Sequence, residues 1–241
     1  MRKPIAIILA AGVGRRFGEA STGQPKALLE VEGETLLARL IRQLRLAGVD
    51  EIVVVAGFGI DSIREAVGSD VEVLWNPDFE RGAILSLYTA RDFFDRDLLV
   101  MDADVFGPDE MLSRLVNSPQ ESCFLLDARA EASGEEQMLH VRGDRVWDIA
   151  RQPRGSYDLL GESVGFLKVS VEAAPLLLEL LSARVARGEI DLEHEEVYPD
   201  FLERTHVGFE RVDDLDWTEV DFPEDLERAR AIGRQARGDS A

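Results

Sequence analysis

The chain has 241 residues, 45% of them hydrophobic, and its formal net charge is −20 at pH 7. Length and composition predict one domain with a sizeable core, and the acidic charge makes nucleic acids and anionic membranes poor partners. Cys123 is the only cysteine, so no disulfide can form within the chain and a reducing, cytoplasmic location is expected. No apolar run has the length of a membrane-spanning helix, and the first apolar segment lacks the cleavage site of a signal peptide.

The first feature along the chain is an apolar strand that ends in a glycine turn. Residues 4–11 read Pro-Ile-Ala-Ile-Ile-Leu-Ala-Ala, and Gly12, Gly14, Arg16 and Lys26 follow. Glycines let backbone N–H groups approach a ligand closely, and a concave run of N–H groups holds anions. The arginine and the lysine can add full positive charges to phosphate oxygens. The spacing is equally compatible with an ordinary turn, but the combination indicates an anion cradle.

Strand and helix patterns alternate after this turn. Helical spacing of apolar residues, short β-branched runs and glycine stops predict helices at 34–47, 60–67 and 82–94 and strands at 51–56, 71–75 and 98–101. This order implies an α/β fold with a Rossmann-like, mostly parallel sheet flanked by helices. Ligands then bind at the carboxyl ends of the strands.

The second half has a different pattern. It predicts a strand pair at 138–141 and 146–149, a strand at 163–169, helices at 171–187 and 193–204, short strands at 207–212 and 217–220, and a last helix from Pro223. Residues 189–225 hold fifteen acidic side chains against two arginines. Such a stretch is either a solvated face or a pole that attracts cations.

Two pairs of carboxylates follow predicted strands. Asp102 and Asp104 follow the strand at 98–101, and Glu219 and Asp221 follow the strand near the C-terminus. Alternation places the members of each pair on one face, roughly 7 Å apart. Mg²⁺ in phosphate chemistry uses one or two carboxylates plus substrate oxygens, so a magnesium site is a candidate. A solvated strand end and a helix N-cap remain the alternatives.

The motifs together resemble a known family. The string Leu-Ala-Ala-Gly-x-Gly-x-Arg, with Pro-Lys ten residues later, resembles the sugar-phosphate and MobA-like nucleotidyltransferases. Further motifs in matching order resemble the CTP:phosphocholine cytidylyltransferase subgroup over nearly the whole chain. They are Asn-Pro-Asp-Phe at 76–79, Leu-Ser-Leu-Tyr at 85–88, Asp-Ala-Asp at 102–104, Gly-Glu-Ser-Val-Gly-Phe at 161–166 and Trp-Thr-Glu-Val-Asp at 217–221.

The resemblance implies a nucleotide-diphospho-sugar transferase fold, with a nucleotide-binding part at 1–130 and an acceptor-binding part at 131–241 of a single domain. It implies catalytic roles for Lys26, which steadies the reacting phosphates, and Arg16, which holds the leaving pyrophosphate. Asp104 and Asp221 would hold Mg²⁺. The implied nucleotide-binding residues are Leu9, Ala10, Ala11, Gly12, Gly14, Arg16, Lys26 and Ser86, and the implied acceptor-binding residues are Asp102, Glu162, Glu193, Glu196, Tyr198 and Glu219.

The chain departs from that subgroup where an aromatic cage would bind a quaternary ammonium. Residues 135–138 read Glu-Glu-Gln-Met, and 193–196 read Glu-His-Glu-Glu with Tyr198 as the only aromatic residue nearby. Carboxylates suit a primary amine that donates hydrogen bonds. The expected reaction joins CTP to phosphocholine, phosphoethanolamine or 2-aminoethylphosphonate with release of pyrophosphate. His194 is a candidate acceptor contact, with core packing as its alternative.

Other functions stay open. Within the same chemistry, the runner-up is an inositol-1-phosphate or sugar-1-phosphate nucleotidyltransferase, and a nucleotide-binding sensor is the non-enzymatic alternative. A dehydrogenase is disfavoured because Phe17 stands where the dinucleotide fingerprint has its third glycine, and no acidic residue follows the second strand at 57–59. The choice of CTP over another nucleotide, the acceptor and the oligomeric state, a homodimer included, are not decided by the sequence.

Overall fold

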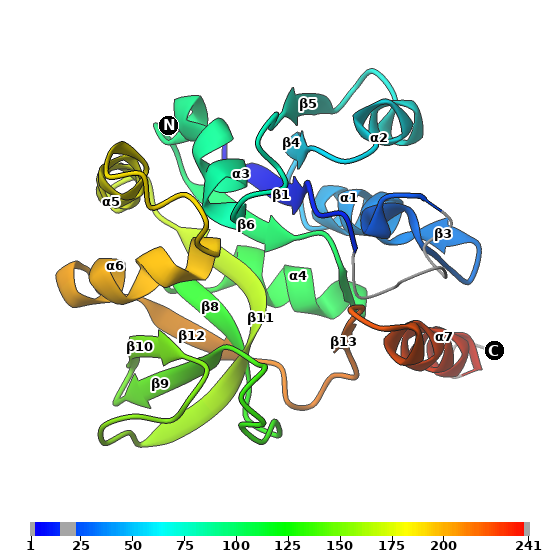
Figure 1. Cartoon of the computed structure of the whole chain (residues 1–241). Coiled ribbons are helices and arrows are strands. Elements are labelled where there is room, and N and C mark those ends of the chain that lie inside the picture. The colour runs from blue at the N-terminus through cyan, green and yellow to red at the C-terminus, as the bar shows by residue number, and fades with distance from the viewer. Residues whose placement is uncertain (1–2, 15–22, 239–241) are drawn as a thin grey trace.

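The structure of the chain, a computed structural model, describes residues 3–14 and 23–238. A central sheet is covered on both faces by helices, which gives three layers (Figure 1). Seven strands follow the order β10-β9-β11-β6-β1-β4-β5, and β8 pairs with both β11 and β12. No helix among these residues combines the length and the apolar character that crossing a membrane requires.

The first half of the chain supplies the parallel part of the sheet. β1 pairs in parallel with β4 and β6, and β4 pairs in parallel with β5. The elements are β1 (Ile5–Ala10), β2 (Glu30–Val31), β3 (Glu34–Thr35), α1 (Leu36–Leu46), β4 (Glu51–Ala56), α2 (Ile60–Val67), β5 (Glu72–Trp75), α3 (Ala83–Thr89), β6 (Leu98–Asp102), β7 (Val105–Phe106) and α4 (Asp109–Asn117), with 3-10 turns η2 (Lys26–Leu28) and η3 (Arg91–Phe93).

The second half extends the sheet mainly through antiparallel pairs. The long strand β11 pairs antiparallel with β6, β8 and β9, while β12 runs parallel to β8. The elements are β8 (Cys123–Asp127), β9 (Met138–Arg142), β10 (Arg145–Ala150), β11 (Leu159–Val169), α5 (Ala174–Ala186), η4 (His194–Val197), α6 (Tyr198–Arg204), β12 (Gly208–Arg211), β13 (Thr218–Glu219) and α7 (Pro223–Gly238).

Alternation along β1 builds two cores, one on each face of the sheet. Ile5 and Ile7 pack on the face covered by α3, α5 and α6, whereas Ala6 and Ile8 pack on the face covered by α1, α2 and α4. A strand buried on both faces reads as a continuous apolar run, as the sequence does here. The predicted α/β fold with a helix-flanked, mostly parallel sheet is confirmed.

Two predicted helices are divided. The helix expected at 82–94 is α3 followed by the short turn η3, and the helix expected at 193–204 is η4 followed by α6. Pro199 occupies the first turn of α6, where a proline is tolerated because that N–H has no partner within the helix. The helix expected from residue 171 begins at Ala174, again with a proline in its first turn.

Candidate active site

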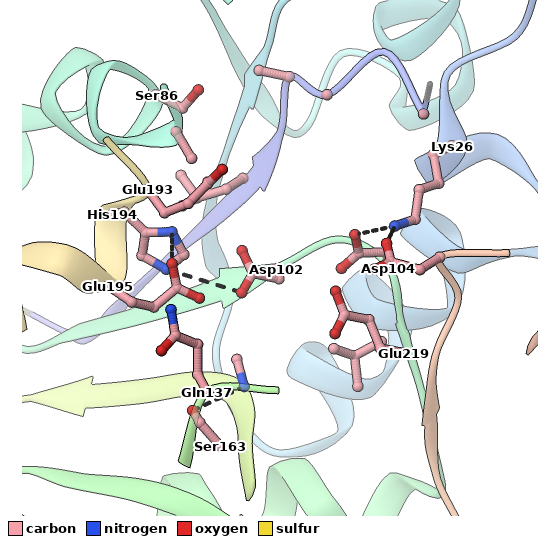
Figure 2. A pocket seen from close by; sticks show the side chains of 18 of the residues that line it. Lys26, Ser86, Asp102, Asp104, Gln137, Ser163, Glu193, His194, Glu195 and Glu219 are labelled. Carbon is pink, nitrogen blue, oxygen red and sulfur yellow. Dashed lines mark hydrogen bonds and ion pairs between the residues drawn. The ribbon is translucent and has the colours of Figure 1, made fainter. Parts of the chain in front are cut away.

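A cavity of about 470 Å³ opens at the carboxyl ends of β1 and β6 (Figure 2). Its walls come from the turn after β1, the start of α3, the end of β6, the middle of β11, the segment before β9, the turn η4 and the segment around β13. Parallel strands place their carboxyl ends on one edge of a sheet, where loops rather than helices meet the ligand. The cavity therefore lies where the strand order predicts a binding site.

The glycine turn forms one wall of this cavity. Of the predicted nucleotide-binding residues around this turn, Leu9, Ala11, Gly12 and Gly14 line the cavity, whereas Ala10 lies in the core of the sheet. Gly14 has a φ of +65°, a conformation that glycine adopts without steric cost, and a Cβ there would lie 3.4 Å from Lys26 Cβ. The turn thus packs directly against the predicted lysine. Arg16 falls outside the described residues.

Lys26 lies beside the turn, among carboxylates. Its Nζ is 2.7 Å from Asp104 Oδ2 and also forms an ion pair with Asp221. Burial alone would lower the pKa of Lys26, but these two carboxylates raise it above its ordinary value. The side chain therefore carries its positive charge throughout the physiological pH range.

Strand pairing brings the C-terminal acids to this lysine. β13 pairs antiparallel with β7, so that Glu219 lies opposite Val105, and the Val220 N–H donates to the Asp104 carbonyl oxygen at 2.9 Å. The indole N–H of Trp217 donates to the buried Asp127 carboxylate at 2.8 Å and holds the segment in place. The two predicted pairs of carboxylates therefore meet in one site.

Asp104, Glu219 and Asp221 form a set of acidic ligands. Their carboxylate oxygens lie within 4.8 Å of one another. Desolvation and the charges of Asp104 and Asp221 raise the pKa of Glu219 to about 8. The Asp104 Oδ1 atom is buried and has no hydrogen-bond partner among the described residues. Carboxylate oxygens are the ligands that Mg²⁺ prefers, so the donor set fits this ion. The predicted metal ligands, Asp104 and Asp221, are both present in it.

Asp102 belongs to a second group beside the first. His194 Nε2 lies 3.9 Å from Asp102 Oδ2, and His194 Nδ1 lies 3.1 Å from Glu195 Oε2. Figure 2 shows Asp102 between this imidazole and the carboxylates near Lys26. β11 has a bulge between Ser163 and Leu167, and Gly165 lies within it. The absence of a side chain at Gly165 leaves room for the Asp102 carboxylate, because a Cβ there would lie 2.6 Å from Asp102 Oδ2.

The segment before η4 is fixed to the start of α3 by backbone hydrogen bonds. The Gly82 N–H donates to the Ile190 carbonyl oxygen at 2.9 Å, and the Ile84 N–H donates to the Leu192 carbonyl oxygen at 3.1 Å. A Cβ on Gly82 would lie 2.0 Å from the Leu192 oxygen, so only glycine permits this approach. These contacts hold His194 and Glu195 over the cavity.

Three more predicted residues line the cavity. Ser86 is buried, and its hydroxyl oxygen accepts a hydrogen bond from the Asn76 side-chain amide at 3.0 Å. Burial and the charge of Glu195 raise the pKa of Glu193. Burial and nearby negative charges raise the pKa of Glu162 to about 7. Ser86, Glu162 and Glu193 thus share the cavity with the glycine turn.

Two predicted acceptor-binding residues do not line this cavity. Glu196 turns away because its carboxylate accepts the Glu193 N–H at 2.8 Å and completes the cap of η4. Tyr198 is 2% exposed and packs in the core, edge-on to Phe124 and His194. The change from a 3-10 turn to an α-helix at this point directs the tyrosine into the core rather than the cavity.

The acidic run from 189 is only partly a pocket wall. Glu189 pairs with Arg184 and Arg187, and Asp191 pairs with Arg81. Glu195 lines the cavity, as do Gln137 and Arg151, which the sequence analysis did not single out. Neither of these two has a local motif. They reach the cavity because β11 pairs with β9 and β9 pairs with β10.

Comparison with known proteins identifies the family. The MobA-like NTP transferase domain matches residues 6–187. The chain belongs to this family. The resemblance that the motifs predict is thereby confirmed.

Curated relatives extend the comparison beyond residue 187. A 2-aminoethylphosphonate cytidylyltransferase from Lancefieldella rimae is 30% identical, over 86% of this chain and 81% of the relative. A bifunctional IPC transferase and DIPP synthase from Rubrobacter xylanophilus is 34% identical over 92% of this chain. The chain spans only 50% of the length of that relative and 38% of the length of another.

The fold has solved counterparts. The structure of the CTP:phosphocholine cytidylyltransferase from Streptococcus pneumoniae superimposes with a TM-score of 0.79 and covers 96% of this chain and 99% of its own, at 22% sequence identity. This likeness supports the nucleotide-diphospho-sugar transferase type of fold that the sequence predicts.

Proposed function

We propose that the chain is a Mg²⁺-dependent cytidylyltransferase that joins CTP to a small phosphonate or phosphate carrying an amine and releases pyrophosphate. The observation that carries this proposal is the convergence of the glycine turn, Lys26 and the acidic set of Asp104, Glu219 and Asp221 in one cavity. The relatives named for phosphonate and phosphocholine cytidylyl transfer support the choice of CTP and of the acceptor class.

The reaction requires positioning and charge neutralisation rather than a strong base. An oxygen of the acceptor phosphonate attacks the α-phosphorus of CTP, a new P–O bond forms, and the bond to pyrophosphate breaks. The acceptor is already an anion near neutral pH, so no proton must be removed from it. The glycine turn, in which Gly12 and Gly14 line the cavity, would bind the leaving phosphates, and Lys26 would neutralise charge that develops in the transition state.

The metal would be held by Asp104 and Asp221, with Glu219 beside them. When bound, Mg²⁺ supplies Lewis-acid stabilisation of phosphate charge. Ser86 also lines the cavity, and since its oxygen accepts a hydrogen bond from Asn76, its O–H is left to donate to the nucleotide.

An inositol-1-phosphate acceptor is the second candidate, and the 34% identity to the Rubrobacter relative favours it. Inositol-1-phosphate would need side chains that form hydrogen bonds with its hydroxyl groups, and it carries no positive charge for the protein to bind. The cavity is lined by ten acidic residues and, among the described residues, by three lysines or arginines. This excess of negative charge favours an acceptor that also carries a positive charge.

The test is pyrophosphate release with CTP, UTP, ATP and GTP, each combined with 2-aminoethylphosphonate, phosphoethanolamine, phosphocholine, inositol-1-phosphate and glucose-1-phosphate. We expect activity with CTP and the amine-bearing acceptors, and none without a divalent cation. Preference for inositol-1-phosphate would replace the first candidate by the second. No release with any pair would favour a nucleotide sensor.

A further inference from the structure

Asp102, His194 and Glu195 form a group of hydrogen-bond acceptors on the cavity wall away from Lys26 (Figure 2). One ligand atom from each lies within 4.8 Å of the others. Among the described residues, neither carboxylate forms an ion pair with a lysine or arginine, and each lies within 4 Å of a nitrogen of the His194 imidazole. Two largely desolvated carboxylates without a cation are costly, so this group favours a positively charged ligand.

The spacing between His194 and Asp102 leaves room for a hydrogen-bond donor from a ligand. The 3.9 Å between His194 Nε2 and Asp102 Oδ2 is too long for a direct hydrogen bond. Acceptors that share one tetrahedral nitrogen at hydrogen-bond distance lie about 4.6 Å apart. Ligands of an octahedral Mg²⁺ lie about 3 Å apart. The 3.9 Å separation is shorter than the first value and longer than the second, so a donor nitrogen between the imidazole and the carboxylate needs a small outward movement of one side chain.

A second observation comes from behind the imidazole. Tyr198 packs edge-on to His194, and its hydroxyl is buried without a hydrogen-bond partner among the described residues. The negative charges of Glu195 and Asp102 act on this hydroxyl and help burial to raise its pKa. His194 itself lines the cavity and is 3% exposed, and its Nδ1 is buried without a hydrogen-bond partner among the described residues. The group is thus a built, enclosed polar wall rather than a solvated acidic patch.

We propose that Asp102, His194 and Glu195 bind the primary ammonium group of the acceptor and select it over a trimethylated ammonium. This inference rests on the proposed function. A primary ammonium offers three N–H donors to three acceptors, whereas a quaternary ammonium offers none and is bound by aromatic faces. Phe79 is the only Phe, Tyr or Trp among the described residues that line the cavity. The wall therefore recognises hydrogen bonds rather than methyl groups.

The decisive variant is Glu195→Gln, which keeps the shape of the side chain and removes its charge. The acceptors are 2-aminoethylphosphonate, its N-trimethyl analogue and propylphosphonate, in which a methyl group replaces the ammonium. In the wild type, kcat/KM with CTP should be at least 10-fold higher for the primary amine than for either analogue. Glu195→Gln should lower kcat/KM for the amine by about 10- to 100-fold, mainly through KM, and leave propylphosphonate unchanged.

Glu196→Gln is the matched control, because it removes the same charge from the neighbouring residue while glutamine can still cap η4. It should retain the wild-type preference. Equal loss for all acceptors in Glu195→Gln, a preference that survives this variant, or better turnover of the trimethylated acceptor would overturn the ammonium site.

Two further measurements separate this inference from the proposed function. If the wild type releases no pyrophosphate with any acceptor, calorimetric binding of 2-aminoethylphosphonate against propylphosphonate tests the ammonium site directly, with the same expected loss in Glu195→Gln. Titration with Mn²⁺ should give equal stoichiometry in wild type and Glu195→Gln. Loss of one bound ion in the variant would assign the group to a second metal instead.

Discussion

Lys26 Nζ lies 2.7 Å from Asp104 Oδ2 and pairs at the same time with Asp221, the other carboxylate that would hold the metal. One positive side chain thus lies between the two acids that would hold the proposed divalent cation. A divalent cation and the Lys26 ammonium cannot both occupy this position. Metal binding would therefore require Lys26 to leave the two carboxylates and contact the phosphates of the nucleotide instead. The lysine and the proposed metal would therefore compete for the same carboxylates before the substrate arrives.

Lys26→Met should separate these two roles. We expect turnover to fall by about 10²–10³, because one charge-stabilising contact in the transition state is lost. Affinity for Mn²⁺ without nucleotide should rise by about 30-fold or more, since the repulsion between a unit charge and a divalent ion about 4 Å away is ~2 kcal/mol even at the dielectric constant of water. Pyrophosphate release and calorimetry measure the two effects. Lys3→Met, on an exposed residue that pairs with Asp50, should change neither. Weaker Mn²⁺ binding in Lys26→Met would refute the competition.

Asp104→Asn and Asp221→Asn should each abolish metal-dependent turnover, because each removes one unit of charge and one oxygen ligand from the acidic set. Mn²⁺ titration should show at least a 10-fold loss of affinity in either variant. Asp61→Asn, whose side chain is 94% exposed, is the control for the loss of a carboxylate. Unchanged metal titrations in both variants would place the metal elsewhere.

Asp102→Asn tests whether the group of Asp102, His194 and Glu195 is separate from the proposed metal ligands. Asp102 faces His194 rather than Lys26, so its variant should keep Mn²⁺ affinity within about threefold of wild type and lose mainly acceptor binding. The measurement is KM for the acceptor beside the Mn²⁺ dissociation constant. A loss of metal affinity as large as in Asp104→Asn would merge the groups into one metal site.

The parts of the site that are local in sequence could be predicted. The glycine turn and the two acids after β6 lie at the ends of apolar strands, and alternation with parallel pairing is enough to place them on one edge of the sheet. Asp221 lies 117 positions beyond Asp104 in the sequence. The pairing of β13 with β7 brings these two acids together. Their joint role as metal ligands was predicted from the family resemblance, because no sequence pattern indicates this strand pairing.

The positions of His194 and Glu195 on the cavity wall were harder to predict, because they depend on a change from a 3-10 turn to an α-helix. In a continuous α-helix over 193–204, successive side chains would be rotated by the same angle around one axis. The 3-10 turn η4 has fewer residues per turn than α6, so the side chains of the two segments point in different directions. His194 and Glu195 thereby face the cavity, while Tyr198 enters the core and Glu196 caps the turn. No local composition signals this rotation.

The pKa of Glu162 predicts a pH dependence of stability. Burial and the charges of Glu136 and Asp127 raise it from an ordinary 4.5 to about 7, so the folded state holds a proton that the unfolded chain has already released. This contribution to stability is present below about pH 4.5 and is lost as the pH rises to about 7. Glu162→Gln should flatten the fall of Tm with pH in this window and melt higher than wild type at pH 8. Parallel pH profiles for the two proteins would show that Glu162 titrates normally.

Gly165 offers a test of how the backbone positions Asp102. Its φ of +80° strains any residue with a Cβ, and a Cβ here would also lie 2.6 Å from Asp102 Oδ2. Gly188 has a nearly equal φ of +78°, but a Cβ there meets nothing within 4 Å. Gly188→Ala therefore reports the backbone strain alone, which costs about 1–2 kcal/mol of unfolding free energy.

Gly165→Ala adds displacement of the carboxylate to this strain. We expect both variants to lose similar stability in urea unfolding, and only Gly165→Ala to raise the acceptor KM, by about 10-fold or more, because Asp102 is pushed away from His194. Affinity for CTP should stay near that of wild type, since the glycine turn lies on the other wall of the cavity. If Gly165→Ala binds the acceptor as well as Gly188→Ala does, the bulge in β11 serves the fold and not the position of Asp102.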